Sequence, residues 1–226
     1  MAAYRYWRLY ITRWNYNGTP STGTGDVRVA EWEFYDGSNT KWPGASPTAF
    51  VLNQSYGGAA RVFDGNLSDA GRCISDLNPG QPWWVKVDLG SVVDIKRVKI
   101  APDGAASIGY HLLDFEIQGS STGAFTGEQD VVVSFVGVTG WVNNTLKEFP
   151  TITVSGTVLD DAGSAAARTV RSYDRATGQL IAEVTSNATT GAYRIPGAAS
   201  GETQVVVLDD SGGTVHEDLI RRVTAA

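Results

Sequence analysis

Short runs in which apolar and polar residues alternate recur along the whole chain, and helical periodicity is nearly absent. The runs are separated by Gly, Asn, Asp and Pro, residues that favour turns. Alternation places successive side chains on opposite faces of a strand. The pattern therefore predicts an all-β protein built from antiparallel strands.

The first part of the chain carries strands rich in aromatic residues. Within 27–35, Ala30, Trp32 and Phe34 fall on one face and Val29, Glu31 and Glu33 on the other, so we expect the aromatic face to form the core. Because they lie in strand-like runs, Trp7, Trp32, Trp83 and Trp84 are expected to be core or strand-packing residues. The predicted strands are 4–12, 27–35, 84–88, 96–101, 114–119, 130–135 and 145–149.

Aromatic composition changes sharply near residue 150. All seven Trp and all seven Phe lie between Trp7 and Phe149, whereas the remainder keeps only Tyr173 and Tyr193 as aromatic residues. Pro150 marks the joint, because proline cannot serve an interior strand. We expect two domains, 1–149 and 150–226. Predicted strands in the second are 151–158, 169–173, 180–185 and 204–208, while 221–226 is either a strand or a tail.

Composition also narrows the function. A net charge of −6 predicts no nucleic-acid partner. Cys73 is alone, so no intrachain disulfide can form. Met1 to Trp14 mixes arginines with aromatics and lacks the apolar run of a signal peptide, and no stretch predicts a membrane span. We therefore expect assembly in the cytoplasm.

Common catalytic motifs are missing from the sequence. A Glu31–Glu33 pair without a cleft is weak support for glycosidase chemistry, so we expect that the protein is not an enzyme.

Four segments together resemble the discoidin or coagulation-factor type C domains of the galactose-binding-like superfamily. They read YWRLYIT (6–12), VAEWEF (29–34), ARVFDGN (60–66) and WWVKVDLG (83–90). The resemblance covers most of residues 4–149 and implies a jelly-roll β-sandwich that binds a ligand without catalysis. In that family the first two segments usually close the domain. Their order here resembles the circularly permuted order found in phage tail and other virion proteins.

The same resemblance implies a calcium site. Such domains often hold one structural Ca²⁺ beside the ligand loops, with oxygens from the DGN turn and from a Glu in the AE strand. Matching motif to motif gives Asp64, Asn66 and Glu31, with Ser68 or Asp69 in the same loop, and hard cations do prefer such oxygen ligands. The alternative is that 64–66 is a plain tight turn and Glu31 a solvated strand residue.

Glycan binding in such modules relies on loop aromatics that stack on sugar rings, joined by side chains that bind hydroxyl groups. Each aromatic residue in a loop can alternatively cover its own core. The candidates outside the predicted strands are Trp42, Tyr56, Arg72, Tyr110, His111 and Trp141.

The second part resembles carboxypeptidase-regulatory or transthyretin-like β-sandwiches, through VSGTV (154–158) and TTGAY (189–193). Together the two resemblances imply a phage virion protein of the tail, baseplate or fibre. It would bind a cell-surface glycan or other virion proteins, as a homo-oligomer or in many copies on the particle, after assembly in the host cytoplasm. The alternatives are a purely structural decoration or adaptor protein, and a carbohydrate-binding module of a glycan-degrading system.

Overall fold

The computed structural model describes residues 3–38, 40–42, 48–51, 54–68, 73–75, 82–102, 109–160, 162–198, 202–208 and 219–224. The fold is all-β, as the alternating pattern predicts. Within these residues, no helix is both long and apolar enough to span a membrane. The chain divides into two units, Met1–Phe149 and Pro150–Ala226, which meet where the aromatic composition changes. Each unit is described by itself.

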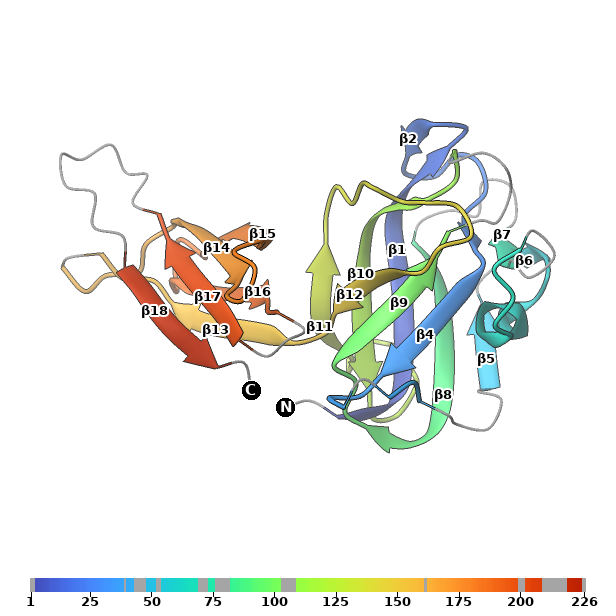
Figure 1. Cartoon of the computed structure of the whole chain (residues 1–226), viewed down its shortest axis with the longest axis horizontal. Coiled ribbons are helices and arrows are strands. Elements are labelled where there is room, and N and C mark those ends of the chain that lie inside the picture. Colours follow the sequence, from blue (N-terminus) through green and yellow to red (C-terminus); the bar gives the residue numbers. More distant parts are fainter. Residues whose placement is uncertain are drawn as a thin grey trace. The chain divides into compact units, whose positions relative to one another are not determined.

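Two sheets face each other in the first unit (Figure 1). The large sheet has the order β11 (Asp130–Phe135), β10 (Leu112–Ser120), β1 (Tyr4–Tyr16), β8 (Trp83–Val93) and β5 (Thr48–Val51), and β2 (Thr19–Ser21) pairs with β1. The three-stranded sheet has the order β12 (Lys147–Pro150), β9 (Arg97–Ala101) and β4 (Glu31–Tyr35). Their arrangement is the β-sandwich expected of a galactose-binding-like domain.

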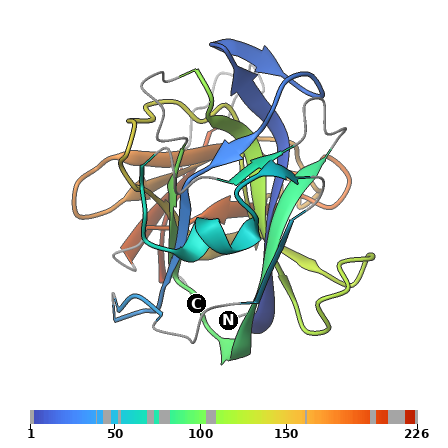
Figure 2. The same ribbon diagram turned by 90° about the vertical axis from the view of Figure 1, so that its right-hand side faces the viewer.

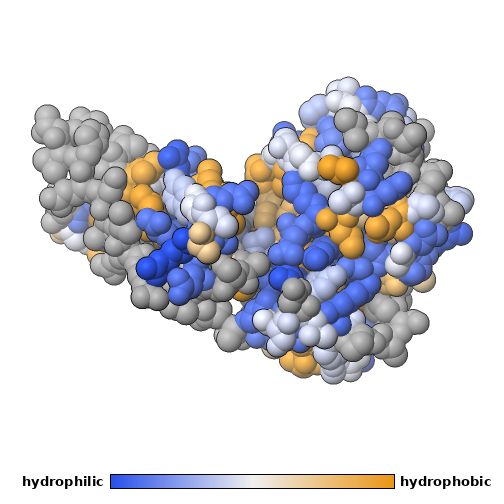
Figure 3. Space-filling view, viewed as in Figure 1, coloured by the Kyte–Doolittle hydropathy of each residue, from blue (hydrophilic) through white to orange (hydrophobic). Residues whose placement is uncertain are grey.

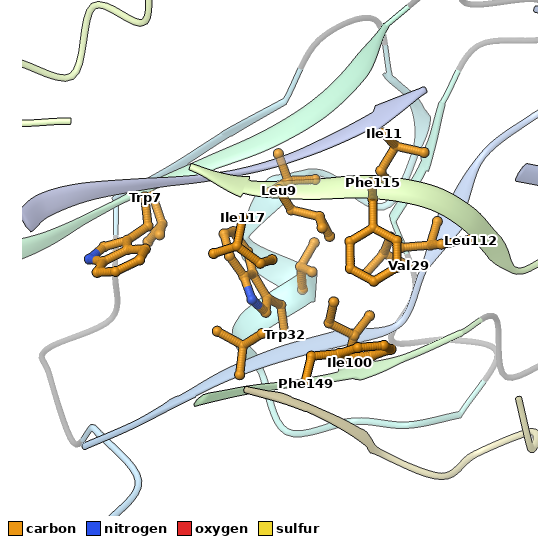
Figure 4. Close-up of a cluster of buried hydrophobic side chains, with 14 of the residues drawn as sticks. Trp7, Leu9, Ile11, Val29, Trp32, Ile100, Leu112, Phe115, Ile117 and Phe149 are labelled. Carbon is orange, nitrogen blue, oxygen red and sulfur yellow. The ribbon is translucent and has the colours of Figure 1, made fainter. Parts of the chain in front are cut away.

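The space between these sheets holds the core, in which tryptophan and phenylalanine rings pack among aliphatic side chains (Figure 4). Trp7, Leu9 and Ile11 point inward from β1 and are fully buried. Trp32 enters from β4, and its ring centroid lies 4.5 Å from that of Phe34. Because side chains alternate along a strand, every second residue of β1 faces away from this core.

The outer face of the three-stranded sheet is charged, and hydrophilic residues dominate it in Figure 3. Glu33 accepts hydrogen bonds from the Tyr35 hydroxyl and from Lys41 Nζ. Arg97 and Lys99 both lie within 4 Å of the Glu148 carboxylate. These contacts pair charges within the face and leave it polar.

A smaller sheet lies beside the sandwich, with the order β3 (Arg28–Val29), β7 (Cys73–Ser75) and β6 (Gln54–Tyr56). Figure 2 looks onto this side, with the 3-10 helix η1 (Ala59–Phe63) in front. The single strand predicted over 27–35 is therefore wrong. Val29 pairs with Cys73, whereas Glu31 pairs with Ala101, so the chain changes sheets at Ala30.

The second unit is also built from strands. One pair joins β13 (Thr153–Thr157) to β16 (Ala192–Pro196). A four-stranded sheet has the order β15 (Leu180–Thr185), β14 (Thr169–Asp174), β17 (Glu202–Val207) and β18 (Leu219–Thr224). Its core is small and aliphatic, and Tyr193 packs against it. Of the C-terminal segment 221–226, for which the sequence allows a strand or a tail, residues 221–224 belong to β18.

Candidate functional site

The small sheet of β3, β7 and β6, which we call the side sheet, brings residues from distant parts of the chain into one row. Ile74 on the middle strand β7 pairs with Arg28 on one side and with Tyr56 on the other. Residues directly opposite each other in neighbouring strands share a face. Arg28, Ile74 and Tyr56 therefore lie side by side on the same face of this sheet.

Both ends of this row are extended by stacked cation and aromatic pairs. The Arg61 guanidinium carbon, on η1, lies 5.1 Å from the centre of the Tyr56 ring. At the other end, the Arg28 guanidinium carbon lies 3.5 Å from the centre of the Tyr110 ring. We call Arg61, Tyr56, Arg28 and Tyr110 the aromatic–arginine row.

Several contacts fix the Tyr110 end of the row. Asp26, which is buried, forms an ion pair with Arg28 Nε. The Tyr110 hydroxyl donates a hydrogen bond to Asn17 Oδ1, and its ring meets Tyr16 edge-on at 5.6 Å. Because the ion pair and the stacking hold the guanidinium plane, Arg28 is preorganised rather than mobile.

The loop aromatics proposed from the sequence have different environments. Tyr56 is the most open of them, with 46% of its surface exposed. Tyr110 is half-buried, and the neighbouring His111 lies within hydrogen-bond distance of Asn15, 2.8 Å from His111 Nε2 to Asn15 Nδ2. Trp141 is only 7% exposed and donates from Nε1 to the Leu112 carbonyl, so it covers the core.

Trp42 lies away from this group. Its backbone N–H donates to the Phe34 carbonyl, and its ring packs against the core. This contact places it at the C-terminal end of β4, whereas Glu31 starts that strand and lies opposite Ala101. The sixth residue, Arg72, lies outside the described residues, as does Asp69 of the calcium set.

Glu31 is buried, contrary to its reading as a solvated strand residue. Only 1% of its surface is exposed, and its carboxylate accepts a hydrogen bond of 2.9 Å from the Gly65 N–H. Burial raises the pKa of this carboxyl group to about 7, and the nearby Asp64 carboxylate contributes in the same direction. The Gly65 N–H opposes the rise without cancelling it.

The DGN turn supplies some, but not all, of the oxygens expected for calcium. Asp64 Oδ1 accepts the Asn66 N–H, and the second carboxylate oxygen accepts no hydrogen bond from the described residues. Asn66 Oδ1 accepts both the N–H and the hydroxyl of Ser68, so its two lone pairs are used within the turn. Among the described residues, no three acidic, His or Cys side chains gather as a metal cluster. The carboxylates of Glu31 and Asp64 therefore fit a hard cation, whereas the Asn66 and Ser68 side chains are already hydrogen-bonded to each other.

A family model described as a NedA-like, galactose-binding domain matches residues 61–195, more than half of the chain. The chain belongs to this family. Domains of this type are generally non-catalytic binding modules, which agrees with the expected lack of catalytic machinery, and their type points to carbohydrate binding. The match starts in η1 and ends in β16, so it includes neither β1 nor β4. Comparisons with curated proteins and with solved structures return no match.

Arg28 and Arg61 are site residues that sequence reasoning missed. Arg28 sits in a strand-like run, and the alternation gives it no special place. The available signal was the Asp26–Arg28 spacing, since residues two apart on a strand share a face and can form an ion pair. For Arg61, the signal was its position just before the DGN turn.

Proposed function

We propose that the first unit binds a cell-surface glycan through the aromatic–arginine row. The observation that carries this proposal is the row itself, in which Arg28 and Tyr56 lie on one face of the side sheet and contact Tyr110 and Arg61, respectively, from outside it. The family of galactose-binding domains supports a saccharide as the ligand.

The chemistry of the row suits a sugar ring. An aromatic ring offers a flat apolar surface to the C–H face of a sugar, and guanidinium groups donate hydrogen bonds to hydroxyl oxygens. The exposed Tyr56 ring would stack on the sugar, while Arg61 and Arg28 on either side would bind hydroxyl groups. Because the Arg28 charge is paired with Asp26, this end of the row favours a neutral sugar.

A bound calcium ion would stabilise this site by ordering the segment next to it. Glu31 and Asp64 would hold the ion, and turn carbonyls and water would complete its coordination shell. The ion would also compensate the negative charge of the buried Glu31 carboxylate. Asp64 directly follows η1, which carries Arg61. A bound cation would therefore fix the segment that positions Arg61 against Tyr56.

The finer proposal is that this module works on a phage virion, in the tail, baseplate or fibre. The permuted order of the four sequence segments supports it, and display in many copies would turn weak single-site affinity into firm attachment. The second unit would link the module to other virion proteins. A purely structural decoration protein would bind no glycan. A module of a glycan-degrading system would bind one, and it would be distinguished by its partnership with a separate catalytic domain.

Glycan-array binding of the full chain, with Ca²⁺ and then with a chelator, tests the proposal. For the best glycan, we expect Tyr56→Ala and Tyr110→Ala each to lower affinity at least tenfold. Tyr173→Ala in the second unit is the matched control and should leave affinity unchanged. If both row variants bind as the wild type does, the site is misplaced. If no glycan binds with Ca²⁺ present, the structural alternative replaces the proposal.

A further inference from the structure

The outer face of the large sheet carries an ordered set of polar and aromatic side chains, separate from the aromatic–arginine row. On β1, Arg8 and Tyr10 point away from the core, between their inward-facing neighbours Trp7, Leu9 and Ile11. Across the sheet Tyr10 lies opposite Trp84 on β8 and opposite Glu116 on β10. Trp84 is therefore not the core residue that the sequence predicts; it is half-buried on this outer face.

Two cations are direct neighbours in the next row of this face. Arg8 lies opposite Lys86 on β8 and opposite Gln118 on β10. Like charges placed directly opposite each other on adjacent strands destabilise a sheet. An arrangement that conflicts with a general rule of sheet stability often marks a functional position.

Arg8 is also buried, with only 7% of its surface exposed. Its Nε donates to Gln118 Oε1 at 2.7 Å, and its Nη1 approaches the Phe125 carbonyl at 3.5 Å. In the part of the chain that the structure describes, Nη2 has no hydrogen-bond partner and no carboxylate pairs with the guanidinium. Burial lowers the pKa of Arg8, although Glu116 and Glu128 act against this from a distance.

An aromatic enclosure surrounds this cation. The guanidinium carbon lies 4.8 Å from the centre of the Tyr10 ring and 4.4 Å from that of Phe125. Lys86 Nζ lies 5.7 Å from the Trp84 ring and donates to the Gly123 carbonyl. Arg8 and Lys86 therefore both lie close to aromatic rings on this face of the sheet.

The segment that holds Phe125 over Arg8 is strained and firmly held. Phe125 has a φ of 56°, in the left-handed region that a bulky residue rarely adopts. The Glu128 carboxylate compensates by accepting the N–H groups of Phe125 and Thr126 and the Ser120 and Thr122 hydroxyls. Such strain persists only where surrounding contacts enforce it, and it is concentrated at ligand sites.

We propose that Arg8 and Lys86 form a carboxylate-binding site for an acidic sugar unit, a uronate whose ring stacks on Tyr10 and Trp84. The carboxylate would lie between the two opposed cations, accepting a hydrogen bond from Arg8 Nη2. The sugar ring would occupy the adjacent aromatic row. Glu116, beyond Tyr10, would accept hydroxyl hydrogens.

This site goes beyond the glycan site proposed above. It lies on β1 and β8 of the large sheet, whereas the aromatic–arginine row is centred on the side sheet. The expected ligand also differs, because the Arg28 charge is already paired with Asp26 and that of Arg8 has no paired carboxylate in the described residues. A polysaccharide containing both neutral and acidic units could occupy both sites.

Galacturonate and galactose are matched probes, since they differ only in carrying a carboxylate or a hydroxymethyl group. With ¹⁵N-labelled full-length protein, the seven tryptophans give indole N–H signals, and Trp84→Phe identifies that of Trp84. We expect galacturonate to shift the Trp84 indole and Arg8 Nε–H signals, with an effect that weakens as salt increases. Galactose and acetate should shift neither signal at the same concentration.

Variants complete the test without requiring a change at the buried Arg8. Lys86→Gln should weaken galacturonate binding at least tenfold, while Arg13→Gln, a cation on β1 already paired with Asp114, should leave it unchanged. The Tyr56→Ala, Tyr110→Ala double variant should retain the Trp84 response. The proposal is overturned if galactose or acetate reproduces the response, if Lys86→Gln binds as the wild type does, or if the response disappears in the double variant.

Discussion

Replacing Glu31 by Gln tests whether a buried carboxylate lies at the start of β4. The wild-type side chain is 1% exposed and accepts one hydrogen bond from the Gly65 N–H. Glutamine has nearly the same shape and keeps an oxygen acceptor for that N–H, but it cannot ionise. The substitution therefore removes the charge and retains the packing.

The expected effect depends on pH in a defined direction. Burial raises the pKa of Glu31 from its usual 4.5 to about 7 in the folded protein. Below about pH 4.5 the group is protonated in both the folded and unfolded states, so its contribution to stability is fully present. That contribution is lost as pH rises through 7. At roughly 1.4 kcal/mol per pH unit, the loss amounts to about 3 kcal/mol.

Thermal unfolding of both proteins, in a chelator at pH 5 and pH 8, measures this contribution. Other titrating groups are common to both proteins, so the difference between them isolates Glu31. From pH 5 to pH 8, the free energy of unfolding of the Gln variant relative to that of the wild type should rise by up to about 3 kcal/mol, or roughly 10 °C in melting temperature. An equal difference at the two pH values would refute the reasoning. Added Ca²⁺ should stabilise the wild type at pH 8 and leave the Gln variant nearly unchanged.

Two substitutions and one labelling experiment test the packing of the two units. Trp32→Ala should cost about 3–5 kcal/mol in urea unfolding, because it empties the centre of the sandwich core. Gly191→Ala should lower the melting temperature of the second unit, at a cost of about 2 kcal/mol or more, since a Cβ there would lie 2.2 Å from the Val158 carbonyl oxygen at a φ of +68°. The Cys73 thiol, whose pKa burial raises to about 12, should react with a thiol reagent only after denaturation.

The all-β class and most strands of the sandwich were predictable, because alternation is a local signal. The segment 130–135 and β11 coincide, and β1 only extends the predicted 4–12 to Tyr16. Alternation does not reveal which sheet a strand joins. The run 27–35 looks continuous, yet Val29 and Glu31 pair with different partners far along the chain.

The candidate site was only partly predictable for the same reason. Aromatic character outside the predicted strands identified Tyr56 and Tyr110, whose rings belong to the row, although Tyr56 lies on β6 and not in a loop. The arginines that stack on them were missed, since the Arg28–Tyr110 contact joins segments that are distant in sequence. Burial of Glu31 was also hidden, because both faces of β4 are covered and an alternating pattern normally indicates one solvated face.

The two-residue period of β1 divides its side chains between the core of the sandwich and the outer face of the large sheet. Trp7, Leu9 and Ile11 point inward, so they carry packing energy, while Arg8 and Tyr10 between them point outward. A change on the outer face therefore leaves the inward set in place. Trp84 shows the same division on β8, where its neighbours Trp83 and Val85 are buried. Because one strand serves both faces, an aromatic-rich sequence can encode a core and an aromatic outer face together, and only the register with neighbouring strands distinguishes them.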